Sequence, residues 1–303
     1  MNEKLLVVGS VAFDSLKTRA GNRHEILGGS ATYIAIAASH FCKVNLVGVV
    51  GEGDFPQAHI DLLTSKRVDL EGLEFAPGKT FRWSGEYADD FSTRQTLDTQ
   101  LGVFEKFDPK IPDAYQGAKI ALLGNINPSV QLQVLNSLKG NPFVITDTMN
   151  LWMDIALEDL KNVIARTNLL VINDEEAVQL SGELQIRVAA RKILAMGPES
   201  LIIKRGEHGA YLFTQDTIFF APAIPLEEVI DPTGAGDSFV GGLAGYLAGE
   251  GKTTVAALKK GMIFGTAVAS ATCEGFGTEQ SAQMTKDDVL NRYYMLLNLV
   301  STD

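Results

Sequence analysis

The chain reads Asp231-Pro232-Thr233-Gly234-Ala235-Gly236-Asp237-Ser238-Phe239 at a boundary between two kinds of sequence pattern. A β-rich segment from Tyr211 to Phe220 precedes it, and small and apolar residues at helical spacing follow from Phe239 to Leu247. The glycines therefore lie where a loop becomes a helix. The first N–H groups of a helix have no intrahelical partner and attract anions. We expect the N–H groups of Gly234, Ala235 and Gly236 to form an anion hole.

Asp237 is unusual at such a helix mouth, because its negative charge would repel a bound anion. It fits a phosphoryl group in transit, if the carboxylate takes a proton from the attacking hydroxyl. This interpretation makes Asp237 a catalytic base. An ordinary glycine-rich turn with Asp237 as helix cap is the alternative that the stretch itself leaves open.

The composition limits the classes of protein to consider. A chain of 303 residues with 46% hydrophobic residues is long and apolar enough for a substantial core. The net charge of −11 argues against nucleic acid as a partner. Two cysteines make no disulfide framework, and neither a signal peptide nor a membrane span is visible. We expect a cytoplasmic protein that binds no nucleic acid and no membrane.

Two features near the start of the chain also sit at element boundaries. Lys4 to Gly9 has the pattern of a buried parallel strand, and Asp14 follows shortly after it, where α/β sheets place ligands. Gly28 and Gly29 precede an Ala- and Ile-rich helical stretch from Ala31 to Phe41. The glycine pair permits either close approach of a ligand or tight packing of helix on strand.

Alternation of strands and helices continues to the end of the chain and predicts a mainly parallel sheet covered on both faces. We expect a single domain over residues 1–303, an α/β fold of three α/β/α layers. Segments around 12–27 and 79–100 are predicted to form a small separate β-sheet. A strand predicted at Leu70 to Phe75 is also assigned to this small sheet, as is one at Ser92 to Thr99. Trp83 there is interpreted either as packing or as a substrate contact.

The stretch from Asp231 to Gly241 resembles the C-terminal signature of the ribokinase-like (PfkB) family of sugar and nucleoside kinases. Further family motifs occur in the expected order, so the resemblance extends from about Lys4 to Leu299. It implies a ribokinase-like fold whose small sheet is a lid over the substrate and often a dimer contact. It also implies that Asp14, Gly28 and Gly29 bind the acceptor. Many relatives carry Asn a few residues after the glycine pair, where this chain has Thr32-Tyr33.

The resemblance implies a nucleotide site as well. Asn173 and Glu176 match the family's Asn-x-x-Glu motif, which holds Mg²⁺ through water near the phosphates of ATP. Lys204, Gly206 and Gly209 match the family's segment at the nucleotide, with Lys204 as a partner for phosphate. Two other residues, Asp231 and Thr233, would bind a monovalent cation such as K⁺, together with the loop at residues 275–277.

The predicted function is transfer of the γ-phosphoryl group of ATP to a hydroxymethyl group of a ribose- or fructose-like sugar. A nucleoside kinase acting on an adenosine-, inosine- or cytidine-like acceptor is the alternative, with the same mechanism. A catalytically idle sugar-binding regulator is disfavoured by the intact Asp237, Asn173 and Glu176. A nicotinamide oxidoreductase is disfavoured because its glycine fingerprint is missing.

Overall fold

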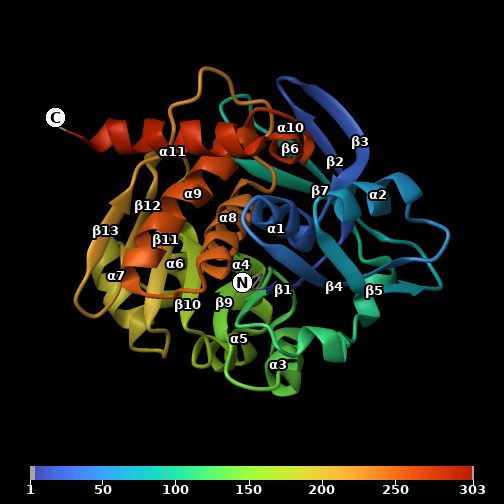
Figure 1. The fold of residues 1–303 in the computed structure, drawn as a ribbon, viewed down its shortest axis with the longest axis horizontal. Helices are drawn as coiled ribbons and strands as arrows, with labels where there is room; N and C mark the ends of the chain where they lie inside the picture. The colour runs from blue at the N-terminus through green and yellow to red at the C-terminus, as the bar shows by residue number, and fades with distance from the viewer. Residues whose placement is uncertain (1–3, 92, 302–303) are drawn as a thin grey trace.

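The computed structural model describes residues 4–91 and 93–301 (Figure 1). Within these residues, nine strands form one sheet in the order β13-β12-β11-β10-β9-β8-β1-β4-β5. Pairing is parallel from β5 to β11 and antiparallel from β11 to β13. The strands are β1 (Lys4–Val8), β4 (Lys43–Gly51), β5 (Val68–Ala76), β8 (Ile120–Leu123), β9 (Phe143–Asp147), β10 (Leu169–Asn173), β11 (Ser200–Lys204), β12 (Ala210–Phe213) and β13 (Ile218–Ala221).

Helices cover both faces of this sheet because its central strands are apolar on both sides. In β1, Leu5 and Val7 belong to one core cluster, and Leu6 and Val8 belong to another. The first face is covered by α1 (Ser30–Ser39), α2 (Gln57–Ser65), α8 (Ala235–Glu250) and α9 (Val255–Cys273). The opposite face is covered by α3 (Pro128–Ser137), α4 (Asn150–Ile155), α5 (Leu157–Ile164), α6 (Asp174–Ser181) and α7 (Ile186–Leu194). The predicted three-layer α/β/α architecture is therefore confirmed.

Two more helices, α10 (Glu279–Gln283) and α11 (Lys286–Val300), pack against α9. Figure 1 shows α11 crossing one side of the molecule, with the C-terminus beyond its end. No helix within residues 4–91 and 93–301 combines the length and the apolar character needed to cross a membrane.

A second sheet has the strand order β3-β2-β6-β7. Its strands are β2 (Ala12–Thr18), β3 (Gly21–Gly28), β6 (Phe81–Tyr87) and β7 (Arg94–Gln100). The central pair, β2 and β6, is parallel, and the two outer pairs are antiparallel. Figure 1 shows this small sheet near α1 and α10. The strand predicted at Ser92 to Thr99 corresponds to β7, although Ser92 itself lies outside the described residues.

The assignment of Leu70 to Phe75 to the small sheet is wrong. This segment lies in β5, which pairs in parallel with β4 at the edge of the main sheet. The physical reason is burial: Val68 and Leu73 pack into the core cluster beneath α1, α2 and α8. Alternation of apolar and polar residues indicated a strand, but it carried no information on which sheet the strand would join.

Candidate active site

The signature stretch forms the start of α8, as predicted. Gly234 is the N-cap residue and has the left-handed backbone conformation, with φ of 74°. An added Cβ there would lie 2.3 Å from a ring carbon of Tyr33, so only glycine fits. Of the three N–H groups predicted for the anion hole, that of Ala235 donates to the carbonyl of Pro232 at 3.1 Å. In the structure, the N–H group of Ala235 is therefore hydrogen-bonded within the turn.

Asp237 is the third residue of α8, so the cap position belongs to Gly234. Its Oδ1 is enclosed and has no hydrogen-bond partner among residues 4–91 and 93–301. Burial raises the pKa of Asp237 to about 7, and the negative charges of Asp147 and Asp14 act in the same direction, while Lys204 opposes them. A carboxyl group with this pKa can accept a proton near neutral pH.

Lys204 connects this carboxylate to the ends of the neighbouring strands. It ends β11, and its Nζ lies 3.2 Å from Oδ1 of Asp147, which ends β9. An added Cβ on Gly236 would lie 3.1 Å from the same Nζ, so the ammonium group borders the start of α8. Although burial lowers the pKa of Lys204, the charges of Asp147, Glu176 and Asp237 raise it above its usual value. Lys204 is therefore paired with Asp147 and also feels the negative charges of Glu176 and Asp237.

Asn173 and Glu176 form a reciprocal cap at the start of α6. The Asn173 side chain accepts from the N–H of Glu176 at 2.7 Å, and Oε2 of Glu176 accepts from the N–H of Asn173 at 2.8 Å. Burial raises the pKa of Glu176 to about 7; Lys204 opposes this shift and Asp147 adds to it. The pair thus stabilises the helix end and also places a buried carboxyl group beside Lys204.

Gly206 and Gly209 lie in the tight turn between β11 and β12. Both have positive φ, of 53° and 80°. An added Cβ on Gly209 would lie 2.3 Å from the carbonyl oxygen of Ala221, whereas the space around Gly206 is open. Gly209 is therefore required by packing, and Gly206 leaves room beside the end of β11.

Asp14 lies in β2 of the small sheet and is almost fully buried. The hydroxyl of Tyr33 donates to its Oδ2 at 3.3 Å. Burial raises the pKa of Asp14 to about 7; the Tyr33 hydrogen bond lowers it, and the charge of Asp231 raises it.

The two glycines of the pair have different neighbours. An added Cβ on Gly28 would lie 2.1 Å from Oδ2 of Asp14, so this glycine makes room for the carboxylate. Gly29 has φ of 89°, and an added Cβ would lie 2.5 Å from the carbonyl oxygen of Ser10. Close packing of the start of α1 against the segment between β1 and β2 is thus the constraint at Gly29.

Asp231 joins two loops. Its Oδ1 accepts from the N–H of Thr233 at 2.9 Å, and its Oδ2 accepts from the N–H of Gly277 at 3.2 Å. The hydroxyl of Thr233 donates to the Tyr87 hydroxyl at 3.0 Å, which ties the small sheet to the signature loop. In the described part of the chain, no three His, Cys, Asp or Glu side chains are grouped to hold a metal ion directly.

Sequence reasoning gave no role to three residues that the structure places here, namely Tyr33, Tyr87 and Arg94. The positive charge of Arg94, in β7, lowers the pKa values of Asp14 and Asp237 and of the Tyr87 hydroxyl. Its guanidinium group also lies over the Trp83 ring, 5.3 Å from the ring centroid. Only Tyr33 carried a signal in the sequence, because it lies where many relatives have Asn.

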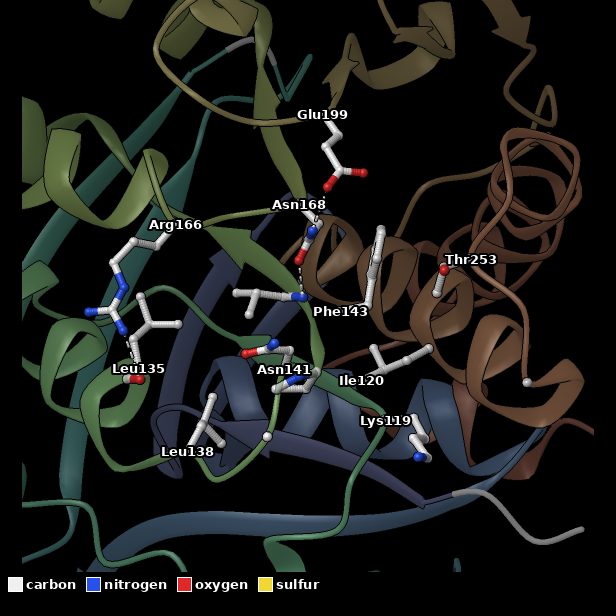
Figure 2. A pocket seen from close by; sticks show the side chains of 14 residues that line it. Lys119, Ile120, Leu135, Leu138, Asn141, Phe143, Arg166, Asn168, Glu199 and Thr253 are labelled. Atoms are coloured by element: carbon white, nitrogen blue, oxygen red, sulfur yellow. Dashed lines mark hydrogen bonds between the residues drawn. The ribbon is translucent and has the colours of Figure 1, made fainter.

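A pocket of about 710 Å³ lies at the opposite edge of the main sheet (Figure 2). Ile120 and Phe143 line it at the amino ends of β8 and β9, whereas the predicted site residues lie at carboxyl ends. Its Asn168 side chain donates to Glu199 and accepts from the N–H of Val144, so these polar groups stabilise the strand ends. The pocket contains none of the predicted site residues.

At the carboxyl edge of the parallel sheet, the start of α8 carries the Asp237 carboxylate, whose Oδ1 has no hydrogen-bond partner among the described residues. This arrangement suits an α/β phosphotransferase. Residues 2–285 match the pfkB family carbohydrate kinases. The chain therefore belongs to the pfkB family, and it is a phosphotransferase with an alcohol group as acceptor.

Individual relatives agree with this assignment. A cytidine kinase of Thermococcus kodakarensis is 34% identical over 81% of this chain and 89% of its own length. A fructokinase of Salmonella typhimurium is 25% identical over 94% of this chain and 96% of its own. In fold, the chain is similar to the nucleoside kinase of Methanocaldococcus jannaschii, an archaeal member of the ribokinase family. The TM-score is 0.77 at 24% identity, over 97% of this chain and 98% of that one.

Proposed function

We propose that the chain transfers the γ-phosphoryl group of ATP to a hydroxymethyl group of a sugar or of the ribose of a nucleoside. The observation that carries this proposal is the enclosed, unpaired Oδ1 of Asp237 next to the glycines at the start of α8. An unpaired buried carboxylate oxygen is costly unless a ligand uses it. An acceptor hydroxyl would supply the missing hydrogen bond.

In the proposed reaction, Asp237 accepts the proton of the acceptor hydroxyl while the oxygen bonds to the γ-phosphorus. The bond between that phosphorus and the bridging oxygen breaks, and ADP leaves with the electron pair. The N–H groups of Gly234 and Gly236 at the start of α8 stabilise the charge on the transferred group. Asp14 accepts hydrogen bonds from other hydroxyls of the acceptor and so fixes its orientation.

Lys204 lies beside Gly236 and is charged, so it would stabilise negative charge at the transferred phosphoryl group. Its pairing with Asp147 holds the ammonium group in position. Glu176 and Asn173 supply oxygen donors of the kind that bind Mg²⁺ through its water ligands. Bound Mg²⁺ would neutralise charge on the β- and γ-phosphates of ATP. In fold, the chain is similar to an Escherichia coli ribokinase II-like protein solved with ATP and Mg²⁺, with a TM-score of 0.80 at 17% identity over 97% of this chain and 99% of that one.

A nucleoside is favoured as acceptor by the 34% identity with a cytidine kinase, against 25% with a fructokinase. A panel of ribose, fructose, cytidine, inosine and adenosine, each with Mg²⁺–ATP, tests both proposals by measuring ADP release. We expect the highest kcat/KM with a nucleoside. Higher kcat/KM with a free sugar would assign the acceptor to the sugars. No ADP release above hydrolysis with any of the five would contradict the proposed transfer.

The small sheet is proposed to act as a lid, because it carries Asp14 and reaches the signature loop through Tyr87. Its outer strand β7 is exposed along its whole length, including Leu97. We propose that this edge pairs with a second copy of the chain. Mass measurement by light scattering tests the proposal: a dimer that Leu97→Lys converts to a monomer would support it, and a monomeric parent would exclude it.

A K⁺ site beside Asp231 and Thr233 is also part of the proposal. Both oxygens of the Asp231 carboxylate already accept backbone N–H groups. The carboxylate therefore holds the two loops together, and its negative charge would attract the cation.

A further inference from the structure

Tyr33 touches two parts of the proposed site at once. It lies in the first turns of α1 and is almost fully buried. Its hydroxyl donates to Oδ2 of Asp14 at 3.3 Å. Its ring lies directly against Gly234, since an added Cβ at that glycine would fall 2.3 Å from Cδ1 of the ring. The Tyr33 side chain thus contacts both the Asp14 carboxylate, which is proposed to bind the acceptor, and the N-cap residue of α8.

Core packing alone does not explain a tyrosine at this position. The rest of α1 is filled with alanine, isoleucine and small polar residues, and phenylalanine would fill the same space as the ring. A buried hydroxyl is unfavourable unless it is hydrogen-bonded. Burial raises the pKa of Tyr33 well above its usual value, and the charges of Asp14 and Asp231 raise it further. The phenol therefore stays protonated and can act as a donor to Asp14.

We propose that Tyr33 is a positioning residue that orients the Asp14 carboxylate toward the acceptor and holds Gly234 at the start of α8. The inference rests on the proposed kinase function. Two consequences follow from the two contacts. Loss of the hydroxyl affects acceptor binding, because Asp14 loses the donor that fixes its direction. Loss of the ring affects turnover as well, because Gly234 loses the surface against which it packs.

Tyr33→Phe removes only the hydroxyl. We expect the KM for the acceptor to rise about tenfold or more, in line with a hydrogen bond to a charged group. We expect kcat and the KM for ATP to stay within about threefold of the parent values, because the ring contact with Gly234 remains. Tyr33→Leu removes the ring too, and kcat is expected to fall at least about tenfold in addition.

Tyr115→Phe is a matched control. Tyr115 is also fully buried, and its hydroxyl donates to an aspartate, Asp69, at 2.6 Å. It lies away from the proposed site, in the core cluster beneath α3. Tyr115→Phe is expected to lower the melting temperature without changing either KM. A purely structural role for Tyr33 predicts the same behaviour for Tyr33→Phe, and that result would overturn the proposal.

A second readout does not depend on activity. The charged groups that act on the Asp14 carboxyl are Asp231 in the signature loop and Arg94 in β7, besides the Tyr33 hydroxyl. Titration of Asp14 by carboxyl ¹³C NMR should give a higher pKa in Tyr33→Phe than in the parent, because the hydrogen bond that favours the ionised form is gone. If the pKa of Asp14 were the same in Tyr33→Phe and in the parent, the proposed role of Tyr33 would be overturned, whatever the acceptor panel shows. If the pKa of Asp14 shifted but no acceptor of the panel were phosphorylated, only the proposed kinase function would be contradicted.

Discussion

Asp237→Asn tests the proposed base most directly. The amide has nearly the same size as the carboxylate but cannot take up the proton of the acceptor hydroxyl. Positioned general bases contribute about 10²–10⁴-fold to rates. We therefore expect turnover at pH 8 to fall at least about a hundredfold, with the KM for ATP nearly unchanged. Release of ADP, measured with the best acceptor of the panel, gives both quantities.

The same substitution should stabilise the fold above neutral pH. The pKa of Asp237 is raised from 3.8 to about 7, and each unit corresponds to about 1.4 kcal/mol. The ionised carboxylate therefore destabilises the folded state by at most about 4 kcal/mol above pH 7. The unfolded carboxyl group loses its proton near pH 4 and the folded one near pH 7. The stabilisation by Asn is thus fully present above pH 7 and declines as the pH falls toward 4.

Even half of this energy would raise the melting temperature at pH 8 by several degrees. Asp288→Asn is the matched control, since Asp288 is the third residue of α11 and lies in a capping box there. It should lower the melting temperature slightly and leave turnover intact. A folded Asp237→Asn variant that keeps more than a tenth of the parent turnover would refute the role of Asp237 as base.

Three further predictions concern the acceptor and the cation. Asp14→Ala should raise the KM for the acceptor by about tenfold or more while the KM for ATP stays unchanged, because charge-assisted hydrogen bonds to the acceptor are lost; equal effects on both would contradict the assignment. Gly28→Ala should also raise the KM for the acceptor, because the new Cβ would lie 2.1 Å from the Asp14 carboxylate. Its control is Gly117→Ala, which places a methyl group in open space and should change neither KM. Activity should be higher in potassium chloride than in a tetraalkylammonium salt of equal ionic strength, and equal rates would exclude the K⁺ site.

The architecture could be predicted from local patterns because each of them has a local physical cause. Apolar runs such as Lys4 to Val8 require burial on two faces, and their alternation with helical segments leads to a covered parallel sheet. Glycines with positive φ, such as Gly234, and the reciprocal cap of Asn173 and Glu176 are likewise determined over a few residues. These features were sufficient to indicate the family resemblance and the helix mouth.

The contacts among these features depend on the order of the strands, which no local pattern contains. The neighbours of β10 are β9 and β11, and this order brings Lys204 next to Asp147, a pairing that the prediction of Lys204 as a phosphate partner did not include. The edge position of β5 was missed for the same reason.

The burial of the carboxyl groups in the site also depends on the whole fold. The raised pKa values of Asp14 and Asp237 arise mainly because the assembled layers exclude water from these carboxyl groups. Tyr33 shows most clearly what depends on local sequence and what depends on tertiary structure. Its place after the glycine pair marked a departure from many relatives, but its contacts with Asp14 and Gly234 exist only where the small sheet, α1 and α8 meet. The local sequence determined which residues form the site, and tertiary packing determined the distances between them and the pKa values of their carboxyl groups.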